Sequence, residues 1–152
     1  MHGQLVDGSG KKARTADVGI SGDRIVFVGN ADKTHITALR TIDATGLIVA
    51  PGFIDPHTHT LADLSNEQSK SNQAYLMQGV TTVITGNDGG SVLNVGDTLR
   101  KWGEQGIGTN GILLAGFGTI RTKVLGPTDA QPNAAQLEEM KQYVGQIGRA
   151  HV

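Results

Sequence analysis

Short apolar runs separated by turn residues fill the first third of the chain. Such runs, bounded by glycine, serine and asparagine, are typical of strands, and a two- or three-residue turn between two of them is typical of a hairpin. The pattern predicts strands at 17–20, 24–29, 41–43 and 47–50, with a loop over 30–39. We therefore expect residues 1–50 to form a small antiparallel β unit, the N-terminal part of a β-sandwich. It has too few strands to close a core alone.

Beyond Gly52 the pattern changes to strands that alternate with helices. It predicts strands at 53–55, 80–85 and 111–115, and helices at about 66–78, 94–105 and 132–144. In the last helix, Leu137, Met140 and Val144 form one apolar stripe. This alternation is typical of a parallel α/β sheet, and a (β/α)8 barrel is one closure of such a sheet. That barrel typically needs about 250 residues, so we expect residues 51–146 to hold only its first three strand–helix units.

Composition narrows the class of protein. The chain has 152 residues, 38% of them hydrophobic and 18% charged, with a net charge of −1. This balance favours neither a nucleic acid nor an anionic membrane as partner. No apolar run approaches the roughly 20 residues of a membrane span and no signal peptide is visible, so we expect a cytoplasmic protein. Cysteine is absent, which excludes disulfides and thiolate ligands from this chain.

Candidate metal ligands occur where the strand after Gly52 ends, in the sequence Asp-Pro-His-Thr-His. Side chains alternate between the faces of a strand, so Asp55, His57 and His59 are expected to point the same way. Two imidazoles on one face can share a divalent metal ion. Taken alone, a His-Thr-His triplet is more often a pair of surface or core histidines. Asp55 would lie one layer below the metal and orient one of the metal-binding side chains. Alternatively, its carboxylate would bond only to the backbone or to an arginine.

A glycine-rich turn at 86–91 follows the next predicted strand and carries Asp88. A carboxylate at this strand end can bind zinc or a harder divalent ion. Asp88 can equally serve as a turn residue that bonds its own backbone. The turn lacks the Gly-Lys-Ser/Thr of phosphate-binding loops.

Three stretches together carry a resemblance to a known family. The opening Pro-Gly to His-Thr-His stretch resembles the first barrel strand of the amidohydrolase superfamily, and residues 79–91 and 110–126 resemble its D-aminoacylase (N-acyl-D-amino-acid deacylase) branch. The resemblance implies a metal-dependent hydrolase whose partner is a small-molecule substrate, an N-acyl-D-amino acid, and which cleaves the C–N amide bond of that substrate. It also implies a divalent metal, commonly zinc, held by His57 and His59. Two further histidines and a proton-transferring aspartate of the family lie on later strands, so this fragment alone is expected to be inactive.

The chain departs from that branch at two positions. Asp88 stands where the branch often has a zinc-binding cysteine, and Phe117 stands where it usually has a histidine between two glycines. Phenylalanine can neither bind a metal nor form a hydrogen bond. Arg121 is a candidate for holding a substrate carboxylate, although a solvated surface arginine is commoner. The alternatives are a cyclic amidase of the dihydroorotase or hydantoinase kind, and a non-catalytic relative that keeps only the barrel.

The last six residues resemble the peptide that results when a common sequencing adaptor is translated in frame. We therefore expect residues 147–152 to be a non-native tail, with a chance match as the alternative. His151 is accordingly left out of the metal site.

Overall fold

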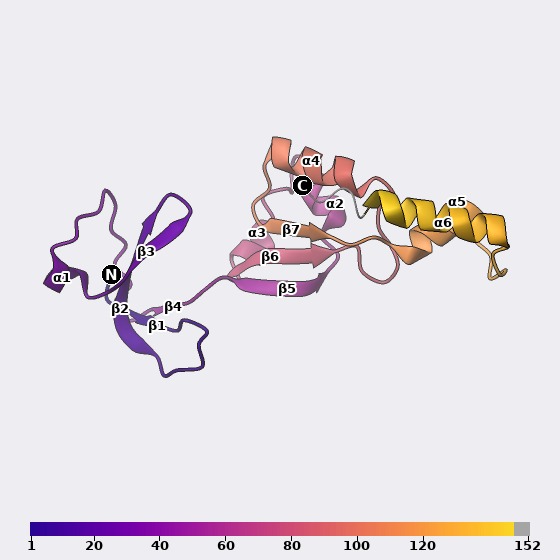
Figure 1. Ribbon diagram of the computed structural model, residues 1–152. Coiled ribbons are helices and arrows are strands. Elements are labelled where there is room, and N and C mark those ends of the chain that lie inside the picture. Colours follow the sequence, from indigo (N-terminus) through magenta and orange to yellow (C-terminus); the bar gives the residue numbers. More distant parts are fainter. Residues whose placement is uncertain (148–152) are drawn as a thin grey trace. The chain divides into compact units, whose positions relative to one another are not determined.

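A computed structural model describes residues 1–147, which form two compact units, Met1–Pro51 and the residues from Gly52 onward (Figure 1). The expected non-native tail lies almost entirely outside the described residues. Within those residues, no helix is long and apolar enough to cross a membrane.

The first unit is a four-stranded sheet in the order β3-β2-β1-β4. Its elements are β1 (Gly3–Leu5), β2 (Arg14–Ser21), β3 (Arg24–Gly29), α1 (Ala31–Thr34) and β4 (Ile48–Val49). The predicted hairpin is confirmed, because β2 and β3 pair antiparallel around Gly22 and Asp23. The sheet is mixed rather than antiparallel throughout, because β4 runs parallel to β1.

Two local predictions in this unit were wrong. Residues 30–39 are not all loop, since Asn30 accepts a hydrogen bond from the backbone N–H of Lys33 and caps the single turn of α1. One turn is too short to show a helical period. Residues 41–43 form no strand. The carbonyl of Ile42 and the N–H of Ala44 bond to Met1, and the carbonyl of Ala44 accepts from the N–H of Leu47.

One buried carboxylate links the start of the chain to α1. Asp17 is only 6% exposed and accepts hydrogen bonds from the backbone N–H groups of Ala31 (2.8 Å) and His2 (2.6 Å). These two bonds, the one from Ala31 foremost, lower the pKa of Asp17 because they stabilise its ionised form.

The second unit is a three-stranded parallel sheet in the order β5-β6-β7, as the strand–helix alternation predicted. Its strands are β5 (Phe53–Thr58), β6 (Val80–Thr85) and β7 (Asn110–Leu113). Its helices are α2 (Leu61–Leu64), α3 (Gln73–Leu76), α4 (Val95–Gln105), α5 (Phe117–Leu125) and α6 (Ala134–Ile147).

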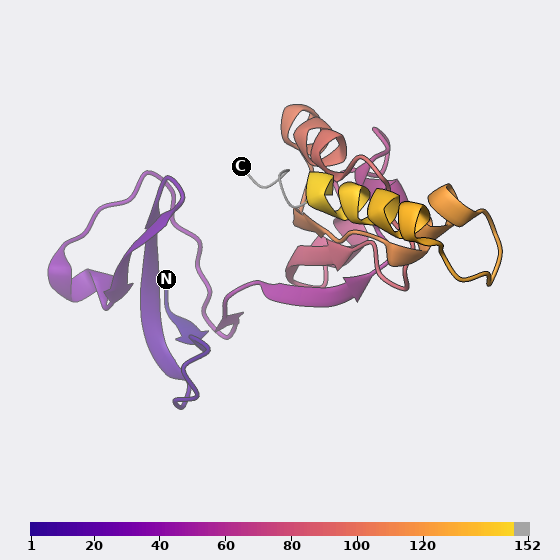
Figure 2. The ribbon, with the colours of Figure 1, turned by 45° about the vertical axis from the view of Figure 1, so that its right-hand side comes forward.

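Helices cover one face of this sheet, and the hydrophobic core lies between the two layers. In both ribbon views α4 and α6 lie on the same side of the strands (Figures 1 and 2). The buried core residues come from α2, β6, α4, β7, α5 and α6: Leu64, Val83, Val95, Trp102, Leu113, Ile120 and Met140. Apolar side chains of the strands that do not face this layer stay accessible, for example Ile112 at 44%. This one-sided packing leaves the uncovered face of the sheet free to carry a site.

The helices differ from the sequence prediction in three places. The helix expected at 66–78 shrinks to α3, because Asn72 takes a left-handed conformation (φ 49°) and donates from Nδ2 to Oγ1 of Thr109. The helix α5 was missed, because it begins in the glycine-rich segment after β7. In α6 only Met140 of the predicted stripe is buried, whereas Leu137 and Val144 are exposed and Tyr143 packs against the core instead.

Close backbone packing holds the loop after β6 in place. Two glycine-to-alanine substitutions, one at this contact and one away from it, test the packing. A Cβ atom on Gly116 would lie 2.6 Å from the backbone of both Gly89 and Ser91, whereas one on Gly103, exposed in α4, would meet nothing within 4 Å. Gly116→Ala is expected to destabilise the protein by roughly 1–3 kcal/mol. Gly103→Ala should stabilise it by up to about 1 kcal/mol through helix propensity. Denaturant unfolding of the protein encoded by the full reading frame that contains this chain measures both changes in the free energy of unfolding, and equal effects would contradict this packing.

Candidate metal centre

The carboxyl end of β5 places two histidines on the open side of the sheet. Thr58 and Thr60 are buried, at 2% and 1% exposure, and the hydroxyl of Thr58 donates to the carbonyl of Ile84 at 2.9 Å. The side chains of His57 and His59, which alternate with these threonines, are 58% and 74% exposed. The two-residue alternation of a strand thus continues past the end of β5 and separates the imidazoles from the buried threonines.

Asp88 approaches the histidines from the loop after β6. The parallel pairing of Thr58 with Thr85 puts the carboxyl ends of β5 and β6 side by side. Asn87 ties the loop to both strands, since its Nδ2 donates to the carbonyls of Thr58 (3.0 Å) and Ile84 (3.1 Å). Asp88 itself has a φ of 58°, in the left-handed region that aspartate and asparagine tolerate better than most residues.

The three side chains converge. Oδ2 of Asp88 lies 3.3 Å from Nε2 of His57 and 3.2 Å from Nε2 of His59. One possible ligand atom from each residue lies within 4.8 Å of the other two. Ligands about 2.0–2.1 Å from a tetrahedral ion are roughly 3.4 Å apart, so these separations suit one shared metal ion. A hydrogen-bonded ion pair between carboxylate and imidazolium has similar separations, so the metal-binding role of the three residues stays a prediction.

The donor set fits a divalent metal. Two imidazole nitrogens and one carboxylate oxygen suit zinc and its first-row neighbours, and the chain has no cysteine that would add a soft thiolate. All three side chains are more than half exposed. Further coordination positions would therefore be open to water, substrate or additional protein ligands.

The other candidates from the sequence lie apart from this cluster or act on the backbone. Asp55 accepts a hydrogen bond from the backbone N–H of His57 (3.1 Å). This bond constrains the backbone at His57 and does not involve the imidazole. Phe117 opens α5 and is 64% exposed. Arg121 donates from Nη2 to the carbonyls of Thr128 and Ala130 and so fastens the segment between α5 and α6. Its role in substrate binding stays a prediction.

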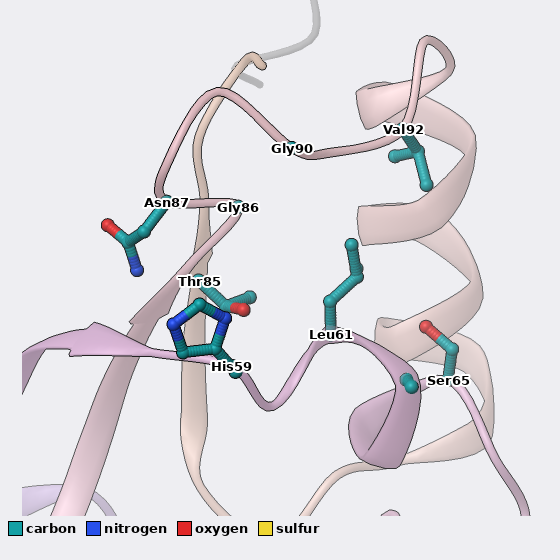
Figure 3. A pocket seen from close by; sticks show the side chains of 9 residues that line it. His59, Leu61, Ser65, Thr85, Gly86, Asn87, Gly90 and Val92 are labelled. Atoms are coloured by element: carbon teal, nitrogen blue, oxygen red, sulfur yellow. The ribbon is translucent and has the colours of Figure 1, made fainter. Parts of the chain in front are cut away.

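A pocket of about 420 Å³ adjoins His59, between the start of α2 and the loop after β6 (Figure 3). The residues lining it are His59, Leu61, Ala62, Ser65, Thr85, Gly86, Asn87, Gly90 and Val92. Asn87 and Thr85 were not recognised as functional candidates in the sequence. The sequence carries no signal that singles out Thr85, because Thr81 and Thr82 of the same strand also carry hydroxyls.

Comparison with known proteins identifies the family. The model of the Amidohydrolase family (Amidohydro_3) matches residues 40–123, more than half of the chain. The chain belongs to this family. The matched residues include His57, His59 and Asp88, and the resemblance noted from the sequence is confirmed.

The family members that resemble the chain include deacylases. A D-aminoacylase of Alcaligenes xylosoxydans xylosoxydans is 46% identical over 87 residues, 57% of this chain and 17% of the relative. An N-acyl-D-aspartate deacylase of the same organism is 33% identical over 160 residues, 90% of this chain and 31% of the relative. The chain thus spans less than a third of the length of these two relatives.

Solved structures agree with the sequence matches. A crystal structure of D-aminoacylase superposes with a TM-score of 0.87 at 28% identity, over 97% of this chain and 35% of its own. An N-acyl-D-glutamate deacylase from Bordetella bronchiseptica, complexed with zinc and a phosphonate inhibitor, gives a TM-score of 0.82 at 28% identity, over 93% of this chain and 34% of its own. The amidohydrolase fold therefore extends over nearly all of the chain.

Proposed function

We propose that the complete protein, meaning the full reading frame that contains this chain, is a metal-dependent hydrolase that deacylates N-acyl-D-amino acids. The observation that carries the proposal is the convergence of His57, His59 and Asp88 at adjacent strand ends. The deacylase names of the relatives point to the C–N amide bond of a small acylated D-amino acid.

The chain's own residues would hold a zinc ion. The Nε2 atoms of His57 and His59 and a carboxylate oxygen of Asp88 would be its ligands, on the open side of the sheet. A zinc ion bound there would lower the pKa of a coordinated water toward about 7 and polarise the scissile carbonyl. Asn87 would hold the Asp88 loop against both strands, so that the carboxylate is placed before the ion arrives.

The architecture proposed for the complete protein follows from the one-sided packing of the second unit. Residues 51–146 would be the first three strand–helix units of a (β/α)8 barrel, and residues 1–50 part of a β-sandwich. At a barrel's C-terminal face, functional residues come from several strand ends. The remaining ligands and the proton-transferring base would come from parts of the complete protein beyond this chain.

Hydrolysis assays on the complete protein test this proposal. We expect release of the free amino acid from N-acetyl-D-amino acids and little from the L enantiomers, with activity lost to a chelator and restored by zinc. Opening of a hydantoin or dihydroorotate ring without deacylation would instead assign a cyclic amidase. Metal binding without turnover of any of these compounds would indicate a non-catalytic relative.

A further inference from the structure

Thr85 is a buried polar residue that the proposed function does not use. It is the last residue of β6 and is 1% exposed. Among the buried side-chain polar atoms of the described residues, its Oγ1 has no hydrogen-bond partner. The neighbouring buried hydroxyls of Thr58 and Thr60 do have partners, namely each other and the carbonyl of Ile84. A buried hydroxyl without a partner is unfavourable, so its retention at this position needs an explanation.

The imidazole of His59 is the polar group in position to supply that partner. His59 and Thr85 line the same pocket, at the carboxyl ends of β5 and β6. Nε2 of His59 faces Asp88 at 3.2 Å. Figure 3 shows the other ring nitrogen, Nδ1, on the side of the Thr85 hydroxyl. The side chain of His59 is 74% exposed, whereas Thr85 is 1% exposed.

We propose that Thr85 is a positioning residue for His59, accepting a hydrogen bond at Oγ1 from Nδ1–H when Nε2 of His59 holds a metal ion. This inference rests on the proposed function. A metal-binding histidine commonly donates its second ring N–H to a nearby acceptor, which fixes the tautomer and the orientation of the ring. Oγ1 of Thr85 is otherwise buried without a partner among the described residues, and this hydrogen bond would satisfy it. It gives the buried hydroxyl a partner at the moment the metal binds.

Metal affinity of the complete protein, stripped of metal and titrated with zinc against a chromophoric chelator, tests the role of Thr85. Thr85→Val keeps the shape and removes the acceptor, so affinity is expected to fall by about 10–100-fold. Thr85→Ser keeps the hydroxyl and should stay close to wild type. Thr109→Val is the matched control, since Thr109 is also buried but bonds to Asn72, away from the pocket. It should leave zinc affinity unchanged.

Thermal unfolding of the metal-free variants separates positioning from simple stability. Thr85→Val should unfold no earlier than wild type, because it removes a hydroxyl that lacks a partner without metal. Zinc affinity of Thr85→Val within twofold of wild type would overturn the inference and leave the proposed function standing. A loss in Thr85→Ser or Thr109→Val as large as in Thr85→Val would also overturn it. Absence of zinc binding in the wild-type protein would overturn the proposed function and this inference together.

Discussion

Replacing His57 by alanine in the complete protein is expected to abolish zinc-dependent deacylation. His57 supplies one of two imidazoles on the open side of the sheet, and its Nε2 lies 3.3 Å from the carboxylate of Asp88. Loss of an outer hydrogen-bond partner of a metal ligand costs about 10–100-fold in metal affinity, and loss of a ligand itself should cost more. Zinc content after dialysis and the rate of amino-acid release measure the two effects.

Two further variants sharpen this prediction. Asp88→Asn removes the negative charge but suits the left-handed conformation at this position, so the loop should keep its shape while zinc affinity falls. His35→Ala removes an exposed histidine of the first unit and should change neither zinc content nor turnover. If His57→Ala keeps full zinc content and activity while His35→Ala behaves as wild type, the metal centre lies elsewhere.

The 152-residue chain expressed alone is expected to aggregate or to lack a cooperative unfolding transition, and to show no deacylase activity. Within the described residues β5 and β7 pair only with β6, so both are open edges of the sheet. Large apolar side chains stay exposed beside them, Phe53 at 63% and Ile54 at 64%. Open edges and uncovered apolar faces favour association between chains.

Thermal unfolding, light scattering and a deacylase assay on the isolated chain check this expectation, with the complete protein as control. A soluble monomer with one cooperative transition would show that the helix-covered face alone stabilises the unit. Chelator-sensitive turnover by that monomer would show further that residues beyond this chain are not required for catalysis.

The strands were predictable from the sequence where side-chain pattern alone decides the structure. Residues 80–85 are apolar or β-branched throughout and form β6 with the predicted ends. Residues 24–29 form β3 with the predicted ends, because the turn at Gly22 fixes the hairpin. Both segments satisfy their backbone groups with a neighbouring strand, which β-branched and alternating runs favour.

The prediction failed where a single side chain or a close backbone contact decides the structure. Asn72 ends the expected long helix by bonding to Thr109, which is 37 residues away in sequence. Gly116 and Gly118 lie against the backbone of Gly89, and this contact allows α5 to begin in a segment with low helix propensity. Such partners lie far apart in the chain, so a local pattern cannot show them.

The candidate site was predictable in its position rather than in its details. The two-residue spacing of His57 and His59 makes their side chains point in the same direction, and the parallel pairing of β5 with β6 brings Asp88 beside them. The bonds that position these groups were not predictable. Asn87 acts across two strands, and Thr85 stands out only because its buried hydroxyl has no partner within residues 1–147.

Anomalous X-ray diffraction at the zinc absorption edge, from crystals of the complete protein, tests the central claim most directly. The account predicts an anomalous peak about 2.0–2.2 Å from Nε2 of His57, from Nε2 of His59 and from a carboxylate oxygen of Asp88. Crystals grown with zinc that show no peak between these residues, or show Asp88 paired with a histidine and the metal bound elsewhere, would contradict it.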